Sequence, residues 1–138
     1  MTVMHRSEWM VVRVQYKFTI PLKPITKKNS QQIIKDKTGR PRIIQSSAYR
    51  KYEKQCEPYM PHIDTIAHKV NVKSVYYMPN NRRVDLTNLH EALHDILVHY
   101  GVLVDDNSKI IVSTDGSYVD VDKWNPRTEV TITDLETG

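Results

Sequence analysis

The chain has 138 residues, of which 39% are hydrophobic and 26% are charged. This length suits one domain with a single hydrophobic core. The composition is that of a folded globular protein, and it excludes wholesale disorder and fibrous classes. We therefore expect residues 1–138 to form one small domain, with residues 1–10 as an N-terminal extension.

Cysteine content and hydropathy limit the compartments in which the protein can act. Cys56 is the only cysteine, which excludes an internal disulfide and a multi-cysteine zinc site and fits a reducing compartment. No segment approaches the roughly 18 apolar residues that a membrane span requires, and residues 1–10 lack the apolar run of an export signal. We expect a cytoplasmic protein with no membrane partner.

The formal net charge is only +4, but the charges are segregated along the chain. Residues 23–51 include nine lysines and arginines and one acid, whereas residues 85–122 include eight acids and one base. A basic stretch beside a separate acidic cluster indicates attraction to phosphates together with a cation site. Two solvated faces of opposite charge would give the same pattern, so charge alone leaves both interpretations open.

The first half of the chain predicts two strands, a polar segment and a helix. Apolar residues alternate with polar ones over residues 12–20, which is typical of a half-buried strand. Residues 26–45 are polar and basic, and they predict a long loop or an irregular hairpin. A helix is expected from Ser46 or Ser47 to about Pro58, and a second strand is expected over residues 69–78. The apolar stripe of that helix consists of Tyr49, Tyr52 and Cys56.

The clearest element is a helix over residues 85–100, with Asp85 as its N-cap and Gly101 at its C-terminal end. Apolar side chains recur at helical spacing on one face, and the polar face carries Thr87, Glu91 and Asp95, each one turn from the next. Strands are expected at residues 102–104, 110–112 and 128–133. This mixture without strict alternation predicts an α+β (mixed α/β) domain, a single small unit with helices packed on a mixed sheet.

Carboxylates flank the helix over residues 85–100, with Asp85 at its start and Asp105 and Asp106 beyond Gly101. We expect the first and last of these to converge, because the chain returns beside the helix after the glycine. Hard divalent cations prefer such oxygen ligands. A Mg²⁺ ion held there can polarise a phosphodiester and lower the pKa of an attacking water.

One motif runs through this helix and the loop beyond it: Arg82-Arg83, Asp85-Leu-x-Asn88-Leu, Asp95-x-Leu97, Gly101 and Asp105-Asp106. The motif is similar to the signature of the RusA family of Holliday-junction resolvases, and the similarity extends over about residues 11–133. The resemblance implies a homodimer that binds four-way DNA junctions and nicks two strands symmetrically with Mg²⁺, for which Mn²⁺ can substitute. It also implies a bacterial or phage-infected bacterial cell, and a metal site formed by Asp85 and Asp106.

Two positions depart from the family's usual pattern. The family usually has an aspartate where this chain has Thr87 and a lysine where it has Glu91, so a carboxylate has moved one turn along the same face. We predict that Glu91 completes the metal site as a catalytic residue, with Asp105 as an alternate ligand. The competing interpretation is an inactive site, in which the protein binds branched DNA without cutting it.

Basic residues outside the helix are predicted to hold phosphates on the DNA arms, where such contacts position the DNA without reading its sequence. They lie in the polar segment and just before the helix: Lys27, Lys28, Asn29, Arg40, Arg42, Arg82 and Arg83.

The helix also contains an H-E-x-x-H pattern, His90-Glu91-Ala92-Leu93-His94, which can place two imidazoles on zinc in a peptidase. No third ligand follows at the spacing of the extended motif. Histidines on the polar side of an amphipathic helix explain the pattern more simply, so a zinc peptidase ranks third among the candidate functions.

Overall fold

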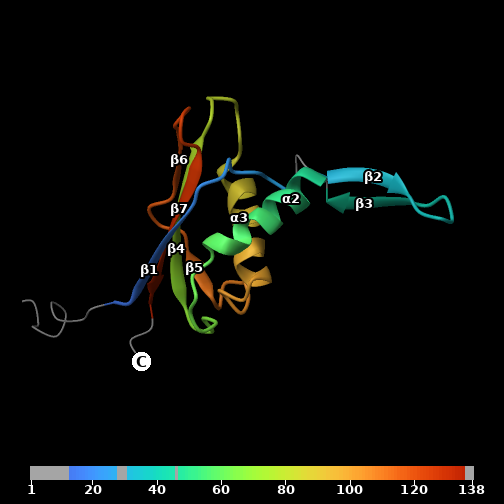
Figure 1. Ribbon diagram of the computed structural model, residues 1–138. Coiled ribbons are helices and arrows are strands. Elements are labelled where there is room, and N and C mark those ends of the chain that lie inside the picture. Colours follow the sequence, from blue (N-terminus) through green and yellow to red (C-terminus); the bar gives the residue numbers. More distant parts are fainter. Residues whose placement is uncertain (1–12, 28–30, 46, 136–138) are drawn as a thin grey trace, which may run out of the picture.

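The computed structural model describes residues 13–27, 31–45 and 47–135, and it contains one mixed five-stranded sheet (Figure 1). The strand order is β1-β7-β4-β5, and β6 pairs with β4 further along the same edge. Strand β7 is antiparallel to both of its neighbours, whereas β5 and β6 are parallel to β4. The strands are β1 (Gln15–Ile20), β4 (Val70–Met78), β5 (Ile111–Ser113), β6 (Tyr118–Val121) and β7 (Arg127–Asp134).

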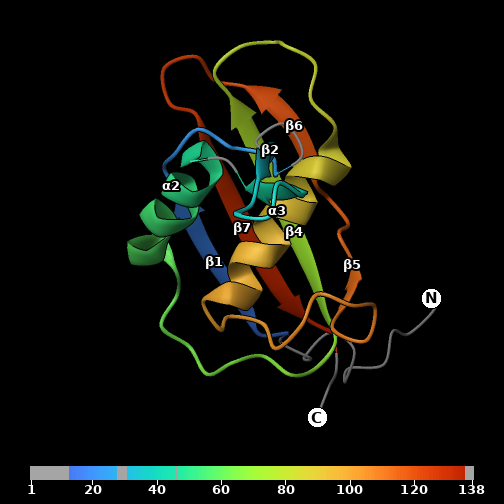
Figure 2. The ribbon, with the colours of Figure 1, turned by 90° about the vertical axis from the view of Figure 1, so that its right-hand side faces the viewer.

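In the described part of the chain, two α-helices pack on one face of this sheet, α2 (Ser47–Cys56) and α3 (Leu86–His99) (Figure 2). A short 3₁₀ helix, η2 (Glu57–Tyr59), follows α2. The arrangement confirms the predicted α+β class. Alternate residues of β7 are buried beneath the helices, and their neighbours face outward, as in a sheet with one covered face. Among the described residues, no helix is long and apolar enough to span a membrane.

Helix α3 supplies much of the core because its apolar stripe faces the sheet. Leu89, Ile96 and Leu97 are at most 1% exposed, and burial of each such side chain contributes about 1.5–3 kcal/mol. The opposite face of the same helix is polar, so the packing that stabilises the helix also fixes the direction in which its acidic residues point.

A hairpin formed by β2 (Gln31–Lys35) and β3 (Pro41–Gln45) projects from the helical side of the domain as a separate two-stranded sheet (Figure 1). Its turn is held by Asp36, whose carboxylate accepts hydrogen bonds from the backbone N–H groups of Thr38 and Arg40 at 2.8 and 3.0 Å. Gly39 occupies the left-handed region with φ of +82°, which favours glycine. The hairpin alternative for the polar segment is therefore confirmed.

Three sequence-based expectations need correction. Residues 102–104 were expected to form a strand. They instead make a single parallel bridge, between Leu103 and Ile66, because the segment pairs with no described strand of the main sheet. Strand β6 was not expected, since Tyr118–Val121 is exposed throughout and lacks alternation of burial. Asp85 occupies the N-cap position of α3, but its side chain makes no capping hydrogen bond to the helix backbone. Residues 1–10, expected to form an extension, lie outside the described part of the chain.

Candidate functional site

The candidate site lies on the polar face of α3, which is directed away from the sheet. Asp85 lies at the start of this helix and is exposed. Its backbone carbonyl accepts the N–H groups of Asn88 and Leu89, both at 3.1 Å, and its carboxylate accepts a hydrogen bond from the Asn88 side chain at 3.3 Å. Among the described residues, this weak contact is the one hydrogen bond that the carboxylate makes, and the carboxylate is therefore open to solvent and to a ligand.

Further along the same face, Asp95 forms an ion pair with Lys27. The lysine comes from the segment that leads toward the projecting hairpin, and its ammonium group lies 6.0 Å from the ring centre of Tyr49 in α2. The Tyr49 hydroxyl donates a hydrogen bond of 3.4 Å to the carbonyl of Ala92 in α3. Burial first, and then the negative charges of Glu53 and Asp95, raise the pKa of Tyr49. These contacts place α2 and Lys27 against the polar face of α3.

The loop after α3 brings two more carboxylates to this region. Asp105 accepts hydrogen bonds from the backbone N–H of Asp106 at 2.7 Å and from the Asn107 side chain at 3.1 Å. Partial burial raises the pKa of Asp106, and hydrogen bonding to the Asp105 carboxyl and the negative charge of Asp95 raise it further. Crowding of carboxylates of this kind is relieved by a bound cation.

The structure brings Asp106 close to Asp95, whereas Asp85 lies at the opposite end of the helix. Ten residues separate Asp85 from Asp95 along the chain, which corresponds to about 15 Å of helix axis. Among the described residues, no three histidine, cysteine, aspartate or glutamate side chains are grouped closely enough to hold a metal ion. The donor chemistry of Asp105 and Asp106 fits a hard cation, but the full set of four ligands is not assembled in this conformation.

Glu91 lies on the same face, between Asp85 and Asp95. It is exposed, and it is close enough to Tyr49 for its charge to raise the pKa of that phenol. Thr87, one turn before it, is also exposed. The polar face is thus an acidic row that runs along α3 from Asp85 through Glu91 and Asp95 and continues into Asp105 and Asp106; below we call these five residues the acidic row.

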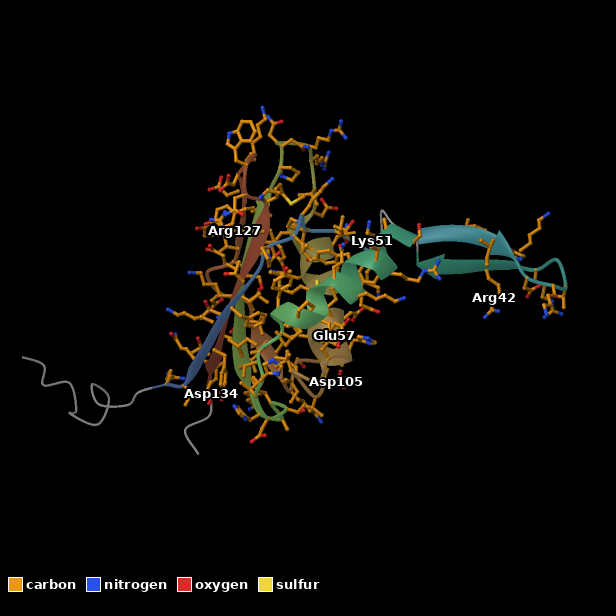
Figure 3. All side chains as sticks on the ribbon, in the orientation of Figure 1. Arg42, Lys51, Glu57, Asp105, Arg127 and Asp134 are labelled. Carbon is orange, nitrogen blue, oxygen red and sulfur yellow. The ribbon has the colours of Figure 1, made fainter. Side chains whose placement is uncertain are left out.

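Basic side chains lie near the Asp85 end of this region and on the projecting hairpin. Arg82 and Arg83 line a hollow of about 200 Å³ together with Lys23, and Arg83 also lines a second hollow of about 220 Å³ that includes Asp85. Arg40 and Arg42 are exposed on the projecting hairpin, and Figure 3 shows Arg42 well away from Asp105 and the domain body. Lys28 and Asn29 lie outside the described residues.

The two histidines of the H-E-x-x-H pattern do not lie free on the surface. The Tyr76 hydroxyl and His90 Nδ1 are 2.7 Å apart in a hydrogen bond, and the rings of His90 and His94 stack with their centres 5.2 Å apart. Burial lowers the pKa of both rings, that of His94 to about 4. The expectation of surface histidines needs correction, because α3 is rotated so that this border of its stripe packs toward β4.

Sequence reasoning did not identify the pairing of Lys27 with Asp95. The sequence predicts that Lys27 binds DNA, and it places Asp95 only on the polar face of the helix. The two residues are 68 positions apart, and a single sequence contains no signal for a contact over that separation.

Comparison with known proteins agrees with this architecture. A family model described as Endodeoxyribonuclease RusA matches residues 21–133, which include the segment before the hairpin, both helices, the acidic row and the closing strand. No match was found among curated proteins. The family match covers most of the 138 residues, so the chain belongs to the RusA endodeoxyribonuclease family.

Proposed function

We propose that this chain is a structure-selective endodeoxyribonuclease that resolves Holliday junctions and other branched DNA by hydrolysing phosphodiester bonds. The observation that carries the proposal is the family match over residues 21–133. The distribution of charge supports it, because basic side chains suited to phosphates lie at one end of an acidic row suited to a cation. Symmetric cleavage of two strands requires two sites, so the working unit in this proposal is a homodimer.

The cation in this proposal is Mg²⁺, with Mn²⁺ as a substitute, held by Asp85, Asp106, Glu91 and Asp105. A bound divalent cation supplies a Lewis acid for the phosphodiester. Asp105 and Asp106 already lie together, and the raised pKa of Asp106 supports a role for their crowded charges in holding a cation. Asp85 and Glu91 would complete the site in the assembled complex, and we assign no reaction step to the ion.

The basic side chains have a separate role in this proposal. Arg82 and Arg83 would hold a phosphate near Asp85, because both line the first hollow and Arg83 also lines the second, which includes Asp85. Arg40 and Arg42 would reach a DNA arm from the projecting hairpin, and Lys28 and Asn29 lie close to them in sequence. Contacts of this type fix the position of the DNA and leave recognition to the shape of the branch.

A noncatalytic protein that binds branched DNA is the second candidate. No three metal-ligating side chains of the described residues are grouped closely enough to hold a metal ion, which favours this candidate, because a site whose carboxylates do not converge would bind DNA without cutting it. A zinc peptidase is not favoured, because His90 Nδ1 is engaged by Tyr76 and His94 Nε2 is buried.

Cation dependence separates these three functions. Purified protein is treated with EDTA and then supplied with Mg²⁺ or Zn²⁺, and cleavage of a four-way junction and of a casein substrate is followed in parallel. Recovery of junction cleavage by Mg²⁺ supports the nuclease. Junction binding that never leads to cleavage supports the second candidate, and casein cleavage recovered by stoichiometric Zn²⁺ supports the peptidase.

A further inference from the structure

The ion pair between Lys27 and Asp95 indicates a role for Lys27 other than positioning the DNA. The lysine side chain is 21% exposed and the aspartate side chain is 35% exposed, so both are partly withdrawn from solvent. Most surface lysines keep the ammonium group in water, and exposed ion pairs add little stability. Lys27 is instead held between the acidic row of α3 and the ring of Tyr49 in α2.

This placement puts a positive charge inside a group of carboxylates. Asp95 pairs with Lys27 directly, and Glu91 lies one helical turn before Asp95 on the same face of α3. A phosphate diester is repelled by such a surface unless cations offset the carboxylates. A phosphate can therefore approach Lys27 only when cations offset the charge of the neighbouring carboxylates. Arg42 differs, because it is exposed on the hairpin away from the domain body (Figure 3).

We propose that Lys27 is a catalytic residue whose ammonium group contacts the phosphate that is cut, and that Asp95 is the positioning residue that holds it. This inference rests on the proposed nuclease function. In the hydrolysis, the oxygen of a water molecule bonds to phosphorus and one phosphorus–oxygen ester bond breaks, which yields a phosphate monoester and a free hydroxyl group. Lys27 forms no covalent bond and transfers no proton; its charge offsets the negative charge that builds up on the phosphate oxygens in the transition state.

The two roles available to Lys27 differ in what they change. A lysine that only anchors a DNA arm contributes equally to the ground state and the transition state, so its removal weakens binding and leaves the rate at saturation unaltered. A lysine on the scissile phosphate contributes more in the transition state, so its removal lowers that rate with little effect on binding.

The test compares Lys27→Met, Lys27→Arg and Asp95→Asn with the parent chain. Lys17→Met is the matched control, because Lys17 is an exposed lysine of β1 in the main sheet and belongs to no part of the proposed site. Cleavage of a labelled four-way junction is measured under single-turnover conditions with saturating protein and Mg²⁺. Junction affinity is measured separately in EDTA by gel shift, and the thermal midpoint of each variant reports its folding.

Lys27→Met is expected to lower the single-turnover rate by about 10²-fold while the junction Kd changes by less than about threefold. Lys27→Arg should recover part of the rate because it retains the charge, and Lys17→Met should cleave like the parent. Asp95→Asn should also be slow, and combining it with Lys27→Met should cause no further loss, because both changes remove the same positioned charge.

Four results would overturn the assignment. A weaker Kd with an unchanged rate at saturation would make Lys27 an arm contact, and a slow Lys27→Met variant with a lowered thermal midpoint and no recovery in Lys27→Arg would make it structural. Equal cleavage by the parent protein and by Lys27→Met would contradict the role of Lys27 and leave the proposed nuclease function intact. A parent protein that binds junctions and never cuts them contradicts the proposed nuclease as well.

Discussion

Tyr76 in β4 and His90 in α3 are joined by a hydrogen bond of 2.7 Å between the tyrosine hydroxyl and Nδ1 of the imidazole. Tyr76 is 1% exposed, and β4 is the strand with which β5, β6 and β7 all pair. The bond therefore fixes α3, and with it the acidic row, to the best-connected strand of the sheet.

Replacing Tyr76 by phenylalanine tests this connection. The substitution keeps the ring and leaves a half-buried imidazole nitrogen without its partner, so the free energy of unfolding should fall by about 1–3 kcal/mol. Urea unfolding at neutral pH measures the loss. Tyr59→Phe is the control, because Tyr59 is 39% exposed and its hydroxyl should contribute less than about 0.5 kcal/mol. Equal stability of the two variants would show that the Tyr76–His90 bond does not stabilise the domain.

His94 should make stability depend on pH. Burial first, and then the neighbouring His90, lower the pKa of His94 to about 4, and Asp95 opposes the shift. In the unfolded chain the pKa is about 6.5, so stability is complete above that value and falls as the pH drops from 6.5 toward 4. The fall due to His94 should reach about 2–3 kcal/mol at pH 4.5.

Urea unfolding of the parent and His94→Leu at pH 7.5 and pH 4.5 measures this effect. The variant should lose less stability between the two values, because it has no imidazole to protonate when it unfolds. His62→Gln serves as the control, since His62 is exposed and should leave the pH dependence unchanged. Identical losses in the parent and His94→Leu would contradict the buried, neutral state of His94.

Gly101 should resist substitution because of its backbone conformation. Its φ is +72°, and the chain reverses there with the Val102 N–H donating to the Leu97 carbonyl at 2.9 Å. A Cβ atom at this position would meet only Thr65 at an ordinary 3.6 Å, so the penalty is conformational. Gly101→Ala should lower the free energy of unfolding by about 1–2 kcal/mol. Gly101→Asn should lower it less, because asparagine tolerates this region, and a larger loss for asparagine would contradict the explanation.

Glu91 should be required for cleavage. If its carboxylate completes the cation site, Glu91→Gln should reduce the single-turnover rate of junction cleavage by at least about tenfold and raise the Mg²⁺ concentration needed for half-maximal rate. Glu57→Gln is the control, since Glu57 is an exposed glutamate of η2 and is not part of the acidic row. Full Mg²⁺-dependent cleavage by Glu91→Gln would remove Glu91 from the site.

The hairpin arginines should control the salt dependence of binding. Arg40→Gln combined with Arg42→Gln should weaken junction binding and reduce the slope of log Kd against log salt by about 1 for each phosphate that the protein no longer neutralises. Lys17→Gln is the control, because Lys17 is exposed in β1, which belongs to the main sheet and not to the hairpin. An unchanged slope in the hairpin variant would show that the hairpin does not touch DNA.

Periodic patterns made most of the fold predictable. Spacings of two residues predict strands β1, β4 and β7, and spacings of 3.6 residues predict helices α2 and α3, because one face of each element is buried. Strand β6 was missed because it is exposed throughout and is defined only by its pairing with β4. The hairpin remained one of two alternatives, since a projecting ribbon has no core to impose alternation.

The candidate site was predictable in its residue types but not in its geometry. The sequence shows acids at both ends of α3, yet the return path of residues 101–106 depends on the sheet beneath them and brings Asp106 to Asp95 in place of Asp85. The partner of Lys27 was equally inaccessible, because that pairing depends on how α2 and the segment before the hairpin pack on α3. Local spacing contains no information on either arrangement.

Nicking of a mobile four-way junction tests the central claim most directly. Purified protein is incubated with the labelled junction or with a linear duplex of the same sequence, in Mg²⁺ or in EDTA, beside an Asp106→Asn variant. Paired, symmetric nicks in the junction alone, which need Mg²⁺ and disappear in Asp106→Asn, are the predicted result. Tight binding of the junction by the parent protein with no cleavage in either Mg²⁺ or Mn²⁺ would contradict it, and would leave a protein that binds branched DNA on a nuclease fold.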